Sequence, residues 1–150
     1  MEIDKLICAV KKLTPKTKPK WGKMNATQMV WHCKKFIIFY QNEKNYPPNL
    51  RTKTLGYMHM FFLKPVIKWD YDKYPKNTPT LKFFDPAKAK DVDLEDEKKE
   101  LIKRLKMVNE YNQEFIVNTM HGKVTRDTFK EVVRGHTSFH LKQEVLRLYH

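Results

Sequence analysis

Apolar residues recur at every third or fourth position in four separate stretches of the chain, and this period restricts the fold more than any other feature. Such a period places side chains on one face of an α-helix. Pro15 and Pro19 follow the first stretch, and Asn25 with Gln28 makes a capping-box pattern at the start of the second. The four predicted helices cover residues 3–13, 25–42, 93–119 and 125–147.

A long connection separates the second and third predicted helices. We predict a loop at residues 45–51, a short helix at residues 53–63 that ends before Pro65, and an irregular, proline-rich stretch at residues 69–92. A connection of this length in a compact domain is a structured crossover or carries function. The sequence thus predicts one all-α domain over residues 1–150: a four-helix bundle with a long crossover, containing a short extra helix, between helices 2 and 3.

Composition excludes several classes of protein. Hydrophobic residues make up 41% of the chain, which is enough for a packed core and excludes global disorder, and four glycines are too few for a turn-dense β-sandwich. The sequence contains no run of about 18 uncharged apolar residues, so no membrane-spanning helix is predicted. The first residues do not resemble a signal peptide. Cys8 and Cys33 form no disulfide framework and lie within apolar helical patterns. We therefore expect a reduced, cytoplasmic protein without a membrane partner.

Three histidines are predicted to converge. His136 and His140 are four residues apart, so they share one face of the last helix. His32 lies on the inward arc of the second helix, at a matching level if the two helices are antiparallel neighbours. Two imidazoles on one helix and a third on a facing helix make a three-nitrogen metal site with open positions, which is the catalytic pattern. The alternative is three hydrogen-bonded core or surface histidines.

Two stretches of sequence resemble a known superfamily. Residues 21–33 read WGKMNATQMVWHC, and residues 121–125 and 136–143 read HGKVT and HTSFHLKQ. These stretches resemble the DinB-like (YfiT-like) superfamily of metal-binding bundles, within a branch of uncharacterised function. The resemblance implies an up-down-down-up four-helix bundle in which His32, His136 and His140 hold a divalent metal ion, nickel or zinc. Some members transfer low-molecular-weight thiols, such as bacillithiol or mycothiol, onto electrophiles.

One position departs from the branch. His121 is followed directly by Gly122, where the branch often has a proline after the histidine that precedes the last helix. The local loop is therefore shorter, and we interpret His121 as a residue at the end of the third helix rather than as part of the site.

The chemistry expected of such a site is activation of a nucleophile. A metal ion held by three histidines lowers the pKa of bound water or binds a thiol as thiolate. Gln28, one turn before His32, and Gln143, nearly one turn beyond His140, are candidate catalytic residues that would orient a ligand. The alternative for both is a polar residue near a bundle end. We expect a thiol S-transferase or hydrolase of unknown substrate, in which a low-molecular-weight thiol is a co-substrate candidate.

The remaining aromatic and histidine residues have two interpretations each. His59 either approaches the pocket rim or is a partly buried helix residue, Cys33 is expected in the core, and His150 is terminal. The apolar segment that contains Tyr57, Met60, Phe61 and Phe62 either roofs the pocket or is buried in a homodimer.

The charge of the chain raises a different class of function. Lys plus Arg number 30 against 17 Asp plus Glu, a formal charge of +13. This charge favours anionic partners. These are an anionic small-molecule substrate or, if the chain is instead a basic non-catalytic binding module, nucleic acid or another anionic partner. Only five of the cations are Arg, and no nucleic-acid motif accompanies Trp21, Trp31 and Trp69, so nucleic acid is not expected. A further alternative is a bundle whose metal is only structural.

Overall fold

The chain is mostly helical, as its periodicity predicts. The structure, a computed structural model, describes residues 1–145, without the side chains of residues 62, 63, 67, 144 and 145. Within residues 1–145 no helix is both long and apolar enough to span a lipid bilayer. The helices and strands are α1 (Ile3–Lys11), α2 (Ala26–Tyr40), α3 (Leu50–Met58), α4 (Lys64–Ile67), α5 (Leu94–Glu110), β1 (Phe115–Asn118), β2 (Gly122–Thr125) and α6 (Arg126–Val145).

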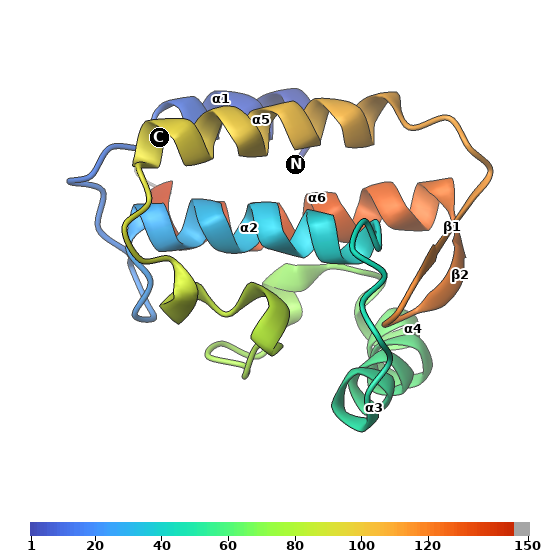
Figure 1. Ribbon diagram of the computed structural model, residues 1–150. Helices are drawn as coiled ribbons and strands as arrows, with labels where there is room; N and C mark the ends of the chain where they lie inside the picture. Colours follow the sequence, from blue (N-terminus) through green and yellow to red (C-terminus); the bar gives the residue numbers. More distant parts are fainter. Residues whose placement is uncertain (146–150) are drawn as a thin grey trace.

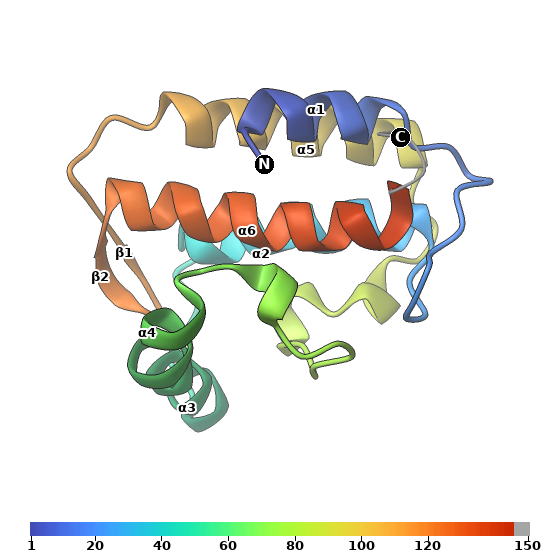
Figure 2. The ribbon, with the colours of Figure 1, turned by 180° about the vertical axis from the view of Figure 1, so that it is seen from behind.

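Four of the helices build the core in two layers. α2 packs against α5 and α6, and α1 packs against the same two helices. Figures 1 and 2 show α1 beside α5 in one layer and α2 beside α6 in the other, with α2 and α5 running opposite to α1 and α6. The buried apolar side chains of these helices, with Leu6, Val30, Leu101 and Phe129 among the most enclosed, form one continuous core. α2 and α6 are therefore antiparallel neighbours, as the histidine argument requires.

The start of α2 follows the predicted capping box. Asn25 Oδ1 accepts from the backbone N–H of Gln28 at 2.9 Å, and Gln28 Oε1 accepts from the N–H of Asn25 at 3.0 Å. These bonds satisfy amides that the first helical turn leaves without partners. The helix therefore begins at a defined residue, which fixes the level of His32 two turns later.

The crossover covers the open side of the α2–α6 layer (Figure 1). Its short helix was predicted to end before Pro65, and this boundary is wrong: α3 passes through a π-helical turn, His59–Leu63, into α4, which includes Pro65. Proline lacks an N–H and its ring crowds the preceding turn, so a wider turn directly before it lets the helical path continue. Beyond α4 the crossover holds three short 3₁₀ turns, Tyr71–Lys73, Lys82–Phe84 and Pro86–Lys88.

The predicted helix over residues 93–119 is wrong in its last third. α5 ends at Glu110, and residues 115–118 pair antiparallel with residues 122–125, with Ile116 opposite Val124. The β-branched residues on both sides of a turn that ends at Gly122 (φ +70°) favour a hairpin over a helix. An all-α class therefore describes the layers but misses this two-stranded sheet, which leads directly into α6.

The two cysteines differ in their surroundings. Cys33 is buried, and its thiol lies 3.8 Å from the sulfur of Met29, in agreement with the predicted core position. Cys8 is exposed, so its apolar helical context did not make it a core residue.

Candidate metal centre

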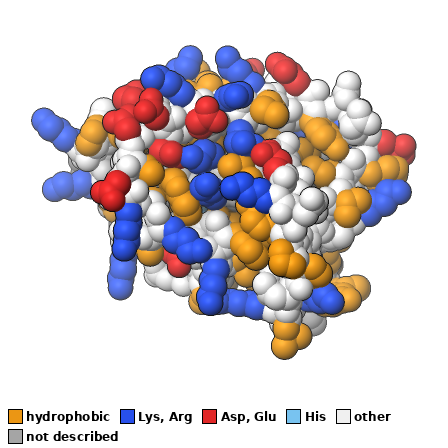
Figure 3. Space-filling model, in the orientation of Figure 1, with side chains coloured by type: hydrophobic (Ala, Val, Ile, Leu, Met, Phe, Trp, Pro, Cys, Tyr) orange, Lys and Arg blue, Asp and Glu red, His pale blue; other side chains and the backbone are white. Residues whose placement is uncertain are grey.

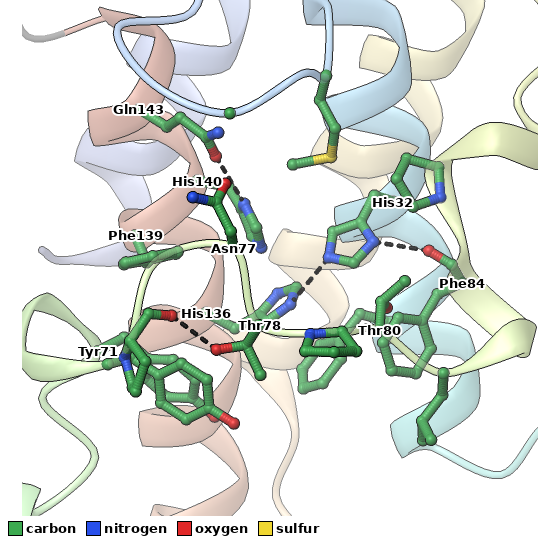
Figure 4. A pocket seen from close by; sticks show the side chains of 18 of the residues that line it. His32, Tyr71, Asn77, Thr78, Thr80, Phe84, His136, Phe139, His140 and Gln143 are labelled. Atoms are coloured by element: carbon green, nitrogen blue, oxygen red, sulfur yellow. Dashed lines mark hydrogen bonds between the residues drawn. The ribbon is translucent and has the colours of Figure 1, made fainter.

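The three predicted ligands lie together. His32 comes from α2, and His136 and His140 come from successive turns of α6. One nitrogen from each ring lies within 4.8 Å of the others, and the Nε2 atoms of His32 and His136 are 3.2 Å apart. Figure 4 shows the three rings directed toward one point. The antiparallel packing of α2 on α6 brings about this convergence across 104 residues of sequence.

Two of these rings are oriented by carbonyl groups behind them. The Nδ1–H of His32 donates to the backbone oxygen of Phe84 at 2.6 Å, and the Nδ1–H of His140 donates to Oε1 of Gln143 at 3.2 Å. Because a neutral imidazole carries one N–H, the Nε2 atom of each ring keeps its lone pair for the cluster. Histidines that hold metal ions commonly donate their second nitrogen to such a partner.

Burial keeps the three rings neutral. It lowers the pKa of His32 to about 4 and, together with repulsion from His32, the pKa of His140 to about 3. Burial, and after it repulsion from His140, His32 and His59, holds the pKa of His136 well below its usual value. Neutral imidazole is the form that binds a metal ion.

This donor set fits a divalent transition metal. Three imidazole nitrogens at this separation could hold one such ion and would leave further coordination positions open. His136 differs from the other two rings in that its Nδ1, on the far side from the contact with His32, is buried with no hydrogen-bond partner among the described residues.

A pocket opens from the three histidines toward the crossover. Its volume is about 390 Å³, within the range of small-molecule sites. Its walls are largely aromatic: the Phe36 ring stacks on the His136 ring at 3.8 Å, Phe84 packs edge-on against His32, and Phe139 against His140. None of the described side chains that line it is Asp or Glu.

Gln143, a candidate catalytic residue, is hydrogen-bonded to His140. Its Oε1 accepts from His140, and its Nε2 donates to the backbone oxygen of Trp21. It lines the pocket at the end where the loop before α2 passes α6. Gly22 permits this contact, because its φ is +81° and a Cβ there would lie 2.2 Å from Nε2 of Gln143.

Gln28, the other candidate catalytic residue, lies elsewhere. Its side chain is held in the capping box of α2, and it is not among the residues that line the pocket. The one-turn spacing from His32 places Gln28 on the same helix face, but the amide turns toward the helix start, where an unpaired N–H attracts it.

A second buried cluster adjoins the pocket and was not predicted as a unit. His59 Nδ1 lies 3.1 Å from His121 Nε2, His59 Nε2 lies 2.7 Å from the Tyr74 hydroxyl, and His121 Nδ1 lies 2.8 Å from the Tyr40 hydroxyl. His59 and Tyr74 line the pocket. His121 is a buried residue of the hairpin turn, so the expectation that it ends a helix is wrong.

The predicted roof of the pocket comes from different residues. Leu55 and His59 line the pocket from the α3 segment, whereas Tyr57 and Phe61 are 65% and 68% exposed and stack on each other outside it. The side chain of Phe62 and the whole of His150 lie outside the described part of the chain.

Comparison with known proteins does not assign the chain. No family model, no curated protein and no solved structure matches it. The geometry of the three histidines and the pocket is therefore the basis for assigning a function.

Proposed function

We propose that this chain is a cytoplasmic metal-dependent enzyme with the up-down-down-up bundle of the DinB-like superfamily. In this proposal His32, His136 and His140 hold one divalent ion, zinc or nickel, and the reaction is hydrolysis or transfer of a low-molecular-weight thiol. The directions of the helices support this topology, because α1 and α6 run one way and α2 and α5 run the opposite way (Figure 1). The single observation that carries the metal site is the convergence of three neutral imidazoles at the inner end of a pocket.

The chemistry follows from the number of protein donors. An ion held by three imidazoles lowers the pKa of a water molecule or thiol that binds at a remaining position, which supplies a nucleophile at neutral pH. The chain's own part is to hold the donors and exclude bulk water. The carbonyl oxygen of Phe84 and the amide of Gln143 fix the His32 and His140 rings, and the aromatic walls keep the surroundings apolar.

The charge around the pocket supports an anionic small-molecule substrate. Lys23 lines the pocket, and Nζ of Lys76 lies 4.7 Å from the ring centre of Trp21, which also lines it. No described carboxylate opposes these cations within the pocket. A carboxylate-bearing thiol or ester would therefore be attracted to the mouth.

Bound metal is the direct test. The protein is purified without a nickel column, exchanged against zinc or nickel, and its metal content is measured by inductively coupled plasma mass spectrometry. We expect about one equivalent in the wild type, loss of the ion in His136→Ala, and retention in His121→Ala, which removes a buried histidine outside the cluster. Wild-type protein that takes up neither ion contradicts the proposal.

Turnover separates an enzyme from a structural metal site. The metal-loaded protein is assayed for hydrolysis of p-nitrophenyl acetate and for addition of cysteine to 1-chloro-2,4-dinitrobenzene. We expect acceleration of at least one reaction that His136→Ala abolishes. Metal-bound protein that accelerates neither leaves the ion with a structural role only.

A further inference from the structure

The second buried cluster forms a continuous hydrogen-bonded chain. Its members, in order Tyr40, His121, His59 and Tyr74, come from the end of α2, the hairpin turn, the π-helical turn and the loop after the first 3₁₀ turn. Three contacts of 2.8, 3.1 and 2.7 Å join them. This series of hydrogen bonds begins at the buried Tyr40 hydroxyl and ends at the Tyr74 hydroxyl on the pocket wall.

Each ring nitrogen of His59 and His121 has one hydrogen-bond partner within the cluster. Burial lowers the pKa of His59 to about 4 and that of His121 to about 3, so both rings are neutral near pH 7 and each carries one proton. Two proton orders then satisfy all three hydrogen bonds. If Tyr40 donates first, His121 and His59 donate onward and the hydrogen of Tyr74 is free to face the pocket. In the reverse order, the Tyr74 oxygen is free to accept.

The pocket has two tyrosines among its described lining residues, Tyr71 and Tyr74, and of these only Tyr74 has its hydroxyl hydrogen-bonded to a histidine. The three converging histidines of the pocket are taken up as metal donors, and none of its described lining residues is Asp or Glu. Asp85 lies near His32, but its side chain is held by the N–H of Ala87 outside the lining. Lys23 is exposed to solvent at the rim. Tyr74, with His59 behind it, is the lining group whose proton is both oriented and replaceable.

We infer that Tyr74 is the general acid–base residue of this site, and that His59, His121 and Tyr40 form the relay that orients it. This inference rests on the proposed function, since it concerns the same pocket. The arrangement follows the logic of a nucleophile or acid held by a histidine that a third group fixes in one tautomer.

The proton balance of an acyl transfer illustrates the role. The incoming water or thiol first gives its proton to the Tyr74 oxygen, the resulting hydroxide or thiolate attacks the acyl carbon, and the bond from that carbon to the leaving oxygen breaks. The leaving oxygen takes the proton of the Tyr74 hydroxyl, while the Nε2–H of His59 donates a hydrogen bond to the Tyr74 oxygen that remains. The next water or thiol to enter returns its proton to that oxygen. One O–H bond of Tyr74 breaks and one forms in each turnover.

Two esters that differ only in their leaving group test this role. Zinc-loaded wild type and Tyr74→Phe are compared with phenyl acetate and p-nitrophenyl acetate, with and without cysteine. Phenoxide leaves poorly without a proton, whereas nitrophenoxide leaves readily. We expect Tyr74→Phe to lower kcat/KM about 100-fold or more for phenyl acetate, but by less than about tenfold for p-nitrophenyl acetate.

A matched variant controls for the loss of a tyrosine hydroxyl. Tyr111→Phe removes a hydroxyl that donates to the backbone oxygen of Phe115 outside the pocket, and it should leave both rates unchanged. Tyr40→Phe removes the far end of the relay, and a smaller loss that again falls mainly on phenyl acetate is expected because Tyr40 acts through two imidazoles.

A measurement without turnover checks that the relay exists. Long-range ¹H–¹⁵N spectra of metal-free protein report the protonation of each ring nitrogen. We expect His59 and His121 to remain neutral from pH 7 down to pH 5, and Tyr74→Phe to change their nitrogen shifts while leaving those of His32 in place.

The outcomes distinguish the two proposals. An equal loss on both esters, or no loss in Tyr74→Phe, overturns the acid–base role even where zinc-dependent activity is present. Metal-loaded wild type that transfers a thiol but hydrolyses neither ester overturns the acid–base role alone. Wild-type protein that takes up neither zinc nor nickel, or that binds an ion and accelerates neither ester hydrolysis nor thiol transfer, contradicts the proposed function and the relay together.

Discussion

At the scale of single residues, Gly22 sets how closely the loop before α2 approaches the last histidine of the cluster. Its left-handed backbone (φ +81°) suits glycine, and no side chain fits between it and the Gln143 amide. Since that amide orients His140, Gly22 affects the histidine cluster through its contact with Gln143. Its position ten residues before His32 in the sequence plays no part.

Substitution of this glycine should weaken metal binding. In Gly22→Ala the new Cβ displaces Gln143, which loosens the His140 ring, and partners of this kind are worth about 10–100-fold in metal affinity. Zinc affinity is measured by competition with a chromophoric chelator. Gly122→Ala is the control, because Gly122 is also left-handed (φ +70°) but has open space around its Cβ position. Equal affinities in the two variants would contradict the role given to Gln143.

The sequence predicted the three converging histidines and missed the relay for a physical reason. His32, His136 and His140 lie on helices whose faces follow from a 3.6-residue period, so their meeting requires only that two helices pack antiparallel. His59 and His121 lie in a π-helical turn and a hairpin turn, and no period relates two such segments. The path of the crossover brings His59 Nδ1 and His121 Nε2 to 3.1 Å from each other, and no local sequence pattern predicts that path.

At the scale of elements, the crossover and α6 touch through a second glycine. A Cβ on Gly135 would lie 2.5 Å from the Tyr71 ring and 2.8 Å from the backbone oxygen of Trp69. The crossover therefore passes against the bare backbone of α6 one residue before His136, and the Tyr71 ring at this contact also lines the pocket.

Alanine at this position should destabilise the protein, against the usual trend. Alanine normally stabilises a helix by up to about 1 kcal/mol relative to glycine, but overpacking here should lower the free energy of unfolding by about 1–3 kcal/mol. Urea unfolding of Gly135→Ala measures it, with the exposed α6 substitution Glu131→Ala as the control. A rise in the free energy of unfolding in Gly135→Ala would show that the crossover moves away from the new methyl group at little cost, and would contradict this prediction.

Predictions at this scale held where local signals agreed and failed where two periods competed. The capping box at Asn25 and the apolar arc of α2 both indicate one helix, and it forms. Between residues 111 and 125 a helical spacing at Phe115 and Thr119 coincides with β-branched pairs and a glycine turn. The hairpin forms because the backbone N–H and C=O groups of β1 pair with those of β2. A helix that ended at Gly122 would not provide these pairs.

At the scale of the whole molecule, the buried histidines make stability depend on pH. His59 and His121 have pKa values lowered to about 4 and about 3, below the value of about 6.5 in an unfolded chain. The folded state therefore binds fewer protons, so their contribution is fully present above pH 6.5 and is lost as pH falls toward the folded values. The histidines of the metal cluster add to this in metal-free protein.

We expect the free energy of unfolding of metal-free protein to fall between pH 7 and pH 5. Each such histidine contributes up to about 1.4 kcal/mol per pH unit below 6.5. Urea titrations at a series of pH values give the slope, and His121→Gln should reduce it by about one proton. A slope that does not change in this variant would mean that His121 is protonated in the folded state.

The formal net charge of the chain is +13. Figure 3 shows Lys and Arg side chains over much of one face, with acidic groups gathered toward the start of α5. This distribution favours weak, general attraction of anions over a nucleic-acid groove. Fluorescence anisotropy with a 20-base-pair duplex should therefore give dissociation constants no tighter than about 10⁻⁶ M at physiological salt. Nanomolar binding that weakens steeply with salt would favour the alternative of a nucleic-acid module.

The separation of His32 and His136 by 104 residues has a consequence for the life of the protein. An ion that bridges them recognises only the folded chain, because an unfolded chain rarely brings such distant residues together. Under the proposed function, each tenfold rise in free metal adds about 1.4 kcal/mol to stability once the site is near saturation. The quantity of intact protein in a cell would then rise and fall with its metal supply, so that metal starvation removes the protein by proteolysis as well as by inactivation.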